Sequence, residues 1–564
     1  MRKIFVFIIV LSSLTLTISA QISTKQLPRS FKTENLMPSF QNVMILSSPD
    51  IDELLYRESQ QKSLFKPHTC AVLIDVNESF FDRAEKISLS DADIYVLRIK
   101  SEGALALNFY SDDFYIPKDC ELYLYNPTKS KTLGAYTQDN NSDDGLFATD
   151  YVYGEELIME YYQPKSVKEK AKLKIQKIGY FFRDIIDFEY ERHLAESEDT
   201  LIDDLPYKGY QDAGSCNVNI NCSEGKNFSN VQRSVVRMLI PITNYEAAWC
   251  TGTLINNTNN DRTPYILSAA HCIEEVRNKS SFSQIEFYFN YSYSGCSNVY
   301  KEPSYSTLTG CELLAYDQKY GYGDSDYMLL KLKNSIPKSF NAYWAGWSRD
   351  CIGIPDCAGI HHPQGDVKKI STVNGKTQEI GYDENVWDYD THVMVRWKKT
   401  SNGFGITEGG SSGSGLFNSK QELIGTLSGG ESSCYVSDYN KVDWYGRFDI
   451  TYNKIWKWID PQYYGYMHFN GMDYTVGLDN EAQESIYLKV YPTVVRRELT
   501  VEINKLKEKG VITLLDRLGR TVYSYQVNEN TKRLTIDVSG LNKGTYFVRL
   551  YSNKDSVIRK IIVE

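Results

Sequence analysis

The chain has 564 residues, of which 42% are hydrophobic and 24% charged. This composition is typical of soluble globular domains rather than of disordered or membrane-embedded chains, and the length predicts three or four folded units. The net charge of −10 argues against a nucleic-acid-binding protein, because such a protein carries a basic face. The 43 tyrosines, with many Thr and Val, favour strands over helices.

The N-terminus has the pattern of an export signal. Arg2 and Lys3 precede the apolar run 4–11, and a softer stretch ends at Ala20. A charged start, a short apolar centre and a small residue at the end predict a signal peptide over residues 1–20, cleaved after Ala20. No later segment offers the ~20 apolar residues that a membrane span needs. We therefore expect an exported chain without a membrane span.

Residues 21–208 form a first β-rich region. The segments 93–99 and 121–125 alternate apolar and polar residues, which predicts strands. Cys70 and Cys120 could form a disulfide within this region, as exported proteins allow. The stretch 139–145 faintly resembles a calcium-binding loop, but it lacks glycine at the sixth position, so we predict a polar hairpin loop.

The remaining chain divides into two further units. Residues 209–475 hold most of the Gly, Trp and Cys, and their short strands and frequent turns predict an all-β barrel or sandwich. Residues 476–485 read as a linker, and 486–564 contain five alternating strands that predict a small β-sandwich. None of the 11 cysteines forms a C-x-x-C motif, and H-E-x-x-H is absent too, so we expect no metal site and no cofactor.

Three residues of the middle unit suit nucleophilic catalysis. His271 ends one apolar run, Asp326 precedes another, and Ser412 lies in the glycine-rich run 409–415. A Ser hydroxyl becomes a nucleophile when a His removes its proton, and the His needs a carboxylate to fix its tautomer. The chain order His, Asp, Ser is chymotrypsin-like. We therefore predict a catalytic triad, with the amides of Gly410 and Ser412 as the oxyanion hole.

Residues 214–473 resemble the lysyl endopeptidases, a bacterial branch of the trypsin-like serine proteases. The resemblance is carried by residues 214–217, 250–258, 344–347, 360–363, 410–415, 429–434 and 445–447. It implies a chymotrypsin-like double β-barrel with the triad between the barrels. It also implies the disulfides Cys216–Cys434, Cys222–Cys296 and Cys250–Cys272. Cys311, Cys351 and Cys357 are additional, and we expect two of them to pair.

The same resemblance implies a pocket for a lysine side chain. Its carboxylate falls on Asp443, with Asp438 as a competitor. The strand 427–430 is expected to pair with the substrate backbone, with Gly429 and Gly430 leaving the pocket mouth open. The family has a His stacked on a Trp near the pocket. Ser428 occupies the His position here, and Trp387 is the candidate for the Trp. His361 and His362 are expected to be structural.

The lysyl endopeptidases have an inhibitory, folding-assisting prosegment, and the first region is well sized for one. Ser411 occupies the position at which trypsin has the Asp that pairs with its new N-terminus, so another device must hold the enzyme inactive. We predict self-cleavage between Lys208 and Gly209, in an exposed stretch rich in charge, Pro and Gly.

Residues 486–564 resemble a C-terminal sorting domain of the type IX secretion system, on segments 490–492, 499–501, 516–520, 541–550 and 560–563. A carbohydrate-binding sandwich is the alternative for this unit. The expected partners are protein or peptide substrates and the secretion machinery, and the expected location is extracellular or at the cell surface. We expect a monomeric endopeptidase that cuts after basic residues, foremost Lys. The alternatives are a protease specific for Arg and a non-catalytic surface adhesin.

Overall fold

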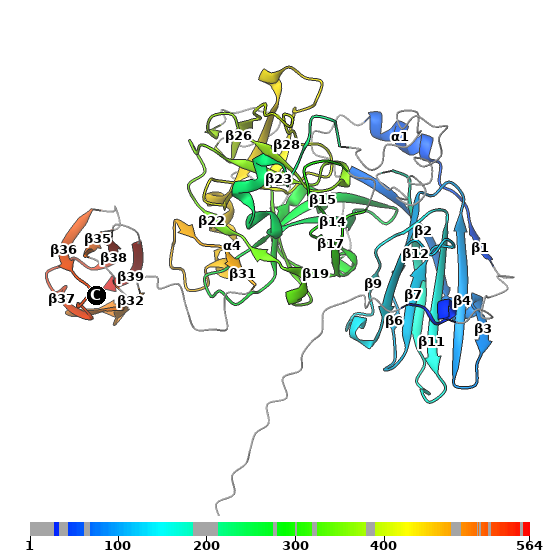
Figure 1. The fold of residues 1–564 in the computed structure, drawn as a ribbon. Coiled ribbons are helices and arrows are strands. Elements are labelled where there is room, and N and C mark those ends of the chain that lie inside the picture. The colour runs from blue at the N-terminus through cyan, green and yellow to red at the C-terminus, as the bar shows by residue number, and fades with distance from the viewer. Residues whose placement is uncertain are drawn as a thin grey trace, which may run out of the picture.

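The computed structural model describes residues 27–32, 43–60, 68–183, 213–273, 279–298, 302–317, 324–379, 390–474, 487–504, 506, 509–516, 520–552 and 556–564. The predicted signal peptide with Ala20, the Lys208–Gly209 junction, Trp387 and the linker 476–485 lie outside the described residues. Among the described residues, no helix is both long and apolar enough to cross a bilayer. Figure 1 shows the three folded units in chain order, from blue to red.

The first unit is a β-sandwich. One of its sheets has the order β1-β4-β11-β7-β8, with β3 paired to β4. Its strands are β1 (Val43–Leu46), β3 (Glu85–Ser88), β4 (Ala92–Ser101), β7 (Glu121–Tyr125), β8 (Thr132–Tyr136) and β11 (Glu156–Pro164). The other sheet contains β2 (His68–Ser79), β5 (Ala106–Ser111), β6 (Phe114–Tyr115), β9 (Phe147–Ala148), β10 (Val152–Tyr153) and β12 (Lys172–Phe181). Leu97, Leu122 and Ile178 belong to the core that both sheets share.

A first barrel of the middle unit follows, with strand order β18-β17-β14-β15-β16-β20-β19. Its strands are β14 (Val235–Pro241), β15 (Glu246–Ile255), β16 (Tyr265–Ala269), β17 (Glu286–Phe289), β18 (Ser306–Thr309), β19 (Cys311–Tyr316) and β20 (Tyr327–Leu332). Gly310 joins β18 directly to β19. Its N–H donates to Ile285, and its carbonyl accepts from Lys333, so the two ends of the sheet meet.

A second barrel has the order β13-β24-β23-β27-β28-β29-β26-β25, and a bridge between Val373 and Trp397 brings its far strands together. Its strands are β13 (Val218–Asn219), β23 (Ala358–His361), β24 (Lys369–Thr372), β25 (Gln378–Glu379), β26 (His392–Arg396), β27 (Gly415–Phe417), β28 (Glu422–Gly430) and β29 (Val442–Arg447). Three small pairings accompany it: β21 (Tyr343–Trp344) pairs with β31 (Met472–Asp473), and β22 (Gly346–Ser348) pairs with β30 (His468–Phe469) and with β28.

Among the residues that the structure describes, helices are few and short. The α-helices are α1 (Ile51–Gln60), α2 (Phe80–Arg83) and α4 (Phe448–Ile459). Buried Phe448 and Ile455 of α4 pack into the core of the second barrel. The 3-10 helices are η1 (Arg29–Lys32), η2 (Gln138–Asn140), η4 (Ser223–Phe228), η5 (Val231–Ser234), η6 (Ala270–Ile273), η7 (Lys279–Gln284), η8 (Lys338–Phe340), η9 (Pro363–Gly365) and η10 (Asp438–Asn440).

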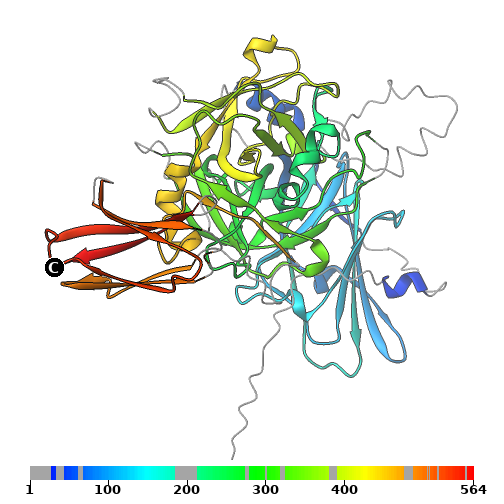
Figure 2. The same cartoon turned by 60° about the vertical axis from the view of Figure 1, so that its left-hand side comes forward.

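The last unit is a two-sheet β-sandwich with its own core, which includes Leu499, Ile512 and Val548 (Figure 2). One sheet has the order β32-β34-β37 and the other β33-β39-β38-β35-β36. The strands are β32 (Tyr487–Tyr491), β33 (Val494–Val495), β34 (Glu498–Asn504), β35 (Gly510–Leu515), β36 (Thr521–Val527), β37 (Arg533–Asp537), β38 (Gly544–Ser552) and β39 (Ser556–Val563). The structure is therefore all-β in class, as predicted.

The first unit and the first barrel share a sheet, which the sequence did not predict. Strand β2 pairs antiparallel with β15, with Ala71 opposite Ala247 and His68 opposite Trp249. Both sides contribute to one buried cluster, in which Tyr151 packs near Trp249. The side-by-side course of β2 and β15 is visible in Figure 1. The first unit therefore adds a strand to the barrel edge and shares its hydrophobic core.

Buried polar groups complement this shared core. Asp150 of the first unit accepts hydrogen bonds from the hydroxyls of Tyr288 (2.9 Å) and Tyr305 (2.6 Å). Lys131 forms an ion pair with Glu302 across the same boundary at 3.0 Å. Burial, followed by the charge of Asp150, raises the pKa of Glu286. A buried charge is costly without partners, so this boundary depends on all of its partners being present.

Two expectations about cysteines were wrong. Cys70 and Cys120 are both buried and not disulfide-bonded. Cys70 lies on β2, and its thiol is 3.5 Å from the Ala247 carbonyl at the boundary with the barrel. Cys120 instead packs in the core between the two sheets of the first unit. The additional cysteines form no disulfide either; they are Cys311, Cys351 and Cys357. As buried free thiols, these cysteines pack in the cores like small apolar residues.

The Asp139–Gly145 stretch is a polar loop whose acidic end serves the boundary with the barrel. The carboxylate of Asp144 accepts from the Ser283 hydroxyl at 2.6 Å and pairs with Lys333 of the barrel. No group of three or more metal-ligating side chains occurs within the residues that the structure describes.

We predict that Asp150→Asn lowers the free energy of unfolding of the full chain by about 1–3 kcal/mol, because buried donors lose a charged acceptor. Asp113→Asn is the matched control. Its side chain is 53% exposed, so the loss of its surface ion pair should cost below about 1 kcal/mol. Denaturant unfolding measures both, and equal losses would contradict the role given to Asp150.

Candidate active site

Strand pairing brings His271 and Asp326 together. In the β16–β20 ladder, Ala269 lies opposite Tyr327, so the residues just beyond that pair meet at the same end. The Nδ1 atom of His271 is 2.8 Å from Oδ2 of Asp326, and its backbone N–H donates to Oδ1 at 3.0 Å. Asp326 adopts a left-handed backbone conformation with φ of 54°, which Asp tolerates better than most residues. Both carboxylate oxygens thus hold one histidine.

The charge state of Asp326 follows from these contacts. Burial alone would raise the pKa of its carboxyl. The positive charge that His271 can carry, and hydrogen bonds from His271 and Ser428, outweigh burial and lower this pKa below its usual range. Asp326 is therefore ionised at neutral pH, and it accepts the proton on Nδ1 of His271. Nε2 is then left as the basic atom of the ring.

Ser412 is held between the barrels by its backbone. Its carbonyl accepts from the N–H of Thr251 on β15 at 2.9 Å, and the N–H of Gly413 donates to Leu427 on β28 at 2.9 Å. Cys272, next to His271, has its sulfur 3.8 Å from the same Ser412 carbonyl. The loop with Ser412 therefore lies against the segment with His271. Ser412 and His271 are 8% and 9% exposed, so both are buried.

Gly410 is required by the shape of this loop. Its φ is 86°, and a Cβ at this position would lie 2.9 Å from the backbone N of Gly365 and from the carbonyl of His362. Its own carbonyl accepts from the Thr251 hydroxyl at 2.8 Å. Within the described chain, the amides of Gly410 and Ser412 donate to no other protein group. They are thus available to a negatively charged oxygen near Ser412.

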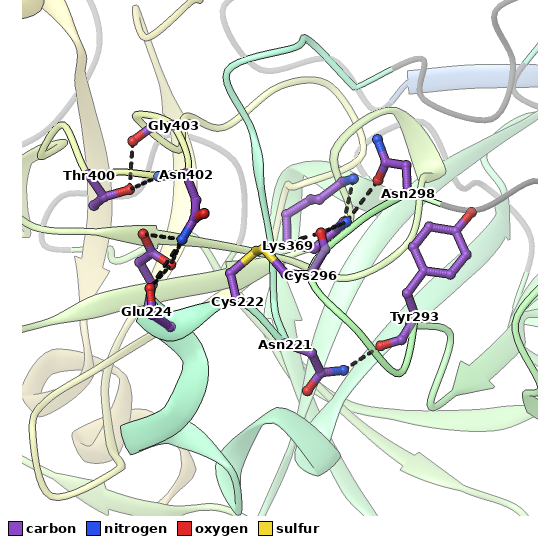
Figure 3. The surroundings of a disulfide bond; sticks show 12 residues. Asn221, Cys222, Glu224, Tyr293, Cys296, Asn298, Lys369, Thr400, Asn402 and Gly403 are labelled. Carbon is purple, nitrogen blue, oxygen red and sulfur yellow. Dashed lines mark hydrogen bonds between the residues drawn. A yellow bond between two sulfur atoms is a disulfide. The ribbon is translucent and has the colours of Figure 1, made fainter.

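Three disulfides tie the middle unit together. Cys250–Cys272 joins β15 to η6, which carries His271, and Cys216–Cys434 connects residues 218 apart in sequence. Cys222–Cys296 is shown in Figure 3 with the polar residues around it. Close to this disulfide, Asn219 donates to the Cys296 carbonyl at 2.7 Å and accepts from Lys369 at 2.8 Å. These disulfides have the pairing that the family resemblance implies.

Asp443 lies on β29, fully buried, opposite Gly430 of β28. Its Oδ2 atom accepts from the hydroxyls of Thr407 and Ser432, both at 2.7 Å, and from the indole of Trp397. A Cβ at Gly430 would lie 1.7 Å from Oδ1, so only glycine fits here. Burial raises the pKa of Asp443 to about 6, although these hydrogen bonds lower it. The carboxylate is thus poised to gain from a cationic partner.

Sequence reasoning missed three of these residues. Trp397, Thr407 and Ser432 come from separate segments, and only the folded barrel aims them at Asp443. The nearest sequence signal is the expectation of a Trp near the pocket; its candidate, Trp387, lies outside the described residues and stays a prediction. The competitor Asp438 has a 72% exposed side chain, so it does not share the buried setting of Asp443.

The neighbouring histidines are buried within the fold. His361 contacts the hydroxyls of Ser411 (2.8 Å) and Ser371 (3.0 Å), and His362 contacts the Asp366 carbonyl at 2.8 Å. Burial, with the charge of a neighbouring lysine in each case, lowers the pKa of His361 to about 3 and that of His362 far below its usual value. Both rings are therefore neutral, and they support the backbone around the Ser412 loop.

Two interlocked barrels with a His–Asp pair and a glycine-flanked Ser between them define a chymotrypsin-like serine protease fold. Residues 210–446 match the family model of the lysyl endopeptidase C-terminal domain, and residues 489–564 match that of a secretion system C-terminal sorting domain. The middle unit is therefore similar to the lysyl endopeptidases, and the last unit is similar to secretion sorting domains.

A lysyl endopeptidase of Pseudomonas aeruginosa is 31% identical over 273 residues, which cover 46% of this chain and 55% of that protein. The chain thus spans about half the length of this curated relative. Two structures of an HtrA-type protease, one with a tripeptide and one with a decapeptide, cover 60% of the chain at 10% identity with TM-scores of 0.28 and 0.29.

Asp443 should make stability depend on pH. In the folded state the Asp443 carboxyl keeps its proton up to about pH 6, whereas in the unfolded chain it loses this proton near the usual pKa of 3.8. Folding is therefore weakened as pH rises between these values, by roughly 3 kcal/mol in total. We predict that Asp443→Asn removes this decline. Denaturant unfolding between pH 3.5 and 7 measures it, and parallel pH profiles for both proteins would contradict the raised pKa.

Proposed function

We propose that this protein is a secreted serine endopeptidase that hydrolyses peptide bonds after basic residues, foremost Lys. The observation that carries the proposal is the His271–Asp326 pair beside Ser412 in a segment that matches the lysyl endopeptidase family model. Asp443 supplies the basis for the substrate preference. A protease specific for Arg and a non-catalytic adhesin are the alternatives that the experiment below separates.

The residues have the roles that peptide hydrolysis needs. His271 Nε2 takes the hydroxyl proton of Ser412, whose oxygen attacks the peptide carbonyl. The resulting oxyanion accepts from the amides of Gly410 and Ser412. His271 then donates the proton to the departing amine, which leaves Ser412 acylated. A water molecule, deprotonated by His271, attacks the acyl group and restores the serine. Asp326 stabilises the imidazolium in both halves.

Specificity follows from Asp443. A lysine ammonium entering the pocket would pair with a buried carboxylate that has no cationic partner among its hydrogen-bonding neighbours. An apolar side chain would leave this charge unpaired, and an acidic one would be repelled. Gly429 and Gly430 are half-buried at the open end of β28. Their lack of side chains leaves room for the substrate backbone to pair there.

We predict that the mature enzyme cuts denatured proteins after Lys and that Ser412→Ala abolishes cleavage. Asp443→Asn should lower kcat/KM for Lys substrates by about 10²–10³-fold, as the loss of a buried ion-pair partner implies. Asp438→Asn, at an exposed position, is the control and should retain activity. Mass spectrometry of the products gives the cut sites. Cuts mainly after Arg would select the second specificity, and an inactive, correctly processed protein would favour an adhesin.

The first unit is proposed to act as the prosegment. Strand β2 pairs with the edge of β15 up to Trp249. The next residue, Cys250, forms the disulfide to Cys272, which adjoins His271. His68 lies against the loop of Ser412, because a Cβ at Gly409 would be only 3.0 Å from its Nδ1 atom. An extended chain in this place obstructs substrate, and its removal would open one side of the site.

We predict that the full chain processes itself between Lys208 and Gly209. The wild-type chain should yield a product whose N-terminus is Gly209, whereas Ser412→Ala should remain full-length under the same conditions. N-terminal sequencing and gel analysis measure this. A mature N-terminus far from Gly209, or equal processing of the Ser412→Ala chain in purified form, would sink the proposed self-cleavage.

The match of the last unit to a secretion sorting domain indicates secretion or a cell-surface location. We propose the type IX secretion machinery as the partner of this unit, together with protein or peptide substrates for the protease. That the mature enzyme is a monomer stays a prediction.

A further inference from the structure

A buried histidine lies behind the catalytic pair and has no role in the mechanism above. His392 begins β26 and is fully buried. Its Nε2 atom is 3.0 Å from the Ser428 hydroxyl, and its Nδ1 atom is 2.8 Å from the Thr391 hydroxyl. A hydrogen bond from Ser428 is in turn one of the causes that lower the pKa of Asp326. A chain of polar contacts therefore runs from β26 of the second barrel to the triad.

A β-bulge aims Ser428 at this position. In the β28–β29 ladder, Leu427 pairs with Tyr445 and Gly429 pairs with Trp444, so Ser428 is an extra residue without a ladder partner. A bulge redirects one side chain without interrupting the rest of a strand. Here it turns the hydroxyl of Ser428, which is 1% exposed, inward between Asp326 and His392.

Counting protons gives the direction of each hydrogen bond in the series from Thr391 to Asp326. Ionised Asp326 can only accept, so Ser428 donates its single proton to that carboxylate. The Ser428 oxygen must then accept from Nε2–H of His392. Because burial lowers the pKa of His392 to about 3, the ring is neutral and carries one proton. Its Nδ1 atom therefore accepts from the Thr391 hydroxyl.

We propose that His392 is a positioning residue for the catalytic Asp326, acting through Ser428. The inference rests on the proposed peptidase function. His392 touches neither the substrate nor the reacting atoms. By donating to Ser428, it fixes that hydroxyl in the orientation that donates to Asp326 and strengthens the bond, since hydrogen bonds in series polarise one another.

The electrostatic surroundings give the sign of the effect. Asp326 is the charged group that acts on His392, and His271 is the titratable group that faces Asp326 on its other side. Near the start of β26, the Arg447 guanidinium is engaged by Asp449 and Glu379. A carboxylate that loses a hydrogen bond becomes a stronger acceptor for its remaining donor. Loss of the His392 donor should therefore favour protonated His271 and displace the acidic limb of the pH–rate profile to higher pH.

The test is a double-mutant cycle on the mature enzyme with a Lys peptide substrate. His392→Leu should lower kcat/KM about 3- to 10-fold, as expected for one hydrogen bond, and should move the acidic limb upward. His392→Gln, which keeps an N–H donor, should retain more activity. In a Ser428→Ala background, His392→Leu should change kcat/KM less than about twofold, because the connection is already cut. His468→Gln, on the half-exposed His468, controls for loss of a histidine elsewhere.

Equal effects of His392→Leu in both backgrounds, or a lower rate with an unmoved acidic limb, would overturn the proposal. If His392→Leu does not fold, Thr391→Val replaces it and should move the limb in the same direction; no movement would overturn the proposal as well.

Nitrogen NMR of the Ser412→Ala protein provides a readout apart from activity. His392 should be protonated on Nε2 alone from pH 5 to 8, and an Nδ1–H tautomer would contradict the inference. A wild-type enzyme that fails to cleave Lys peptides would instead overturn the proposed function alone.

Discussion

The hydrogen bond between His271 Nδ1 and Asp326 Oδ2 is the interaction on which the other features of the site depend. It requires the β16–β20 ladder to end in register, and it requires Asp326 to hold a left-handed backbone. Because the carboxylate is largely removed from water, its charge must be compensated by the groups around it. His271 compensates from one barrel, and Ser428 of the bulged β28 compensates from the other. The junction of the barrels is therefore organised around one negative charge.

A second buried carboxylate, Asp443, is used in a different way. Its hydrogen bonds from Thr407, Ser432 and Trp397 are too few to keep its pKa at the usual value. Because these hydrogen bonds do not fully offset burial, the ionised carboxylate lowers the stability of the fold without a ligand. A cationic ligand would gain binding free energy by pairing with it. The charge of Asp326 is compensated within the protein, which favours a fixed geometry. The charge of Asp443 is compensated only in part, which favours the binding of a cation. The boundary between the first unit and the barrel adds a third buried acidic group, Asp150, which accepts hydrogen bonds from Tyr288 and Tyr305 of the barrel.

Much of this could be predicted from the sequence, because some signals are local. Alternating segments indicated the all-β class, and the runs that hold His271, Asp326 and Ser412 stood out one by one. The pairing of β2 with β15 could not be predicted, because an edge strand carries no mark of the partner it will accept. Cys70 shows the same limit: its place in an exported chain suggested a disulfide, but the fold buries it at that boundary. Trp397 and His392 act on Asp443 and Ser428 over long sequence distances, and no spacing reveals such contacts.

The central claim has three parts: Ser412 is the nucleophile, His271 removes its proton, and Asp443 selects substrates with a lysine side chain. A phosphonate ester with a lysine side chain tests all three parts, because it forms a covalent bond only with an activated nucleophile in reach of the pocket. The measurement is the mass and site of the adduct on the mature enzyme after peptide mapping. The account predicts an adduct on Ser412 that is lost in His271→Ala and forms far more slowly in Asp443→Asn or with a valine analogue. An adduct elsewhere, or equal rates for the lysine and valine reagents, would contradict it.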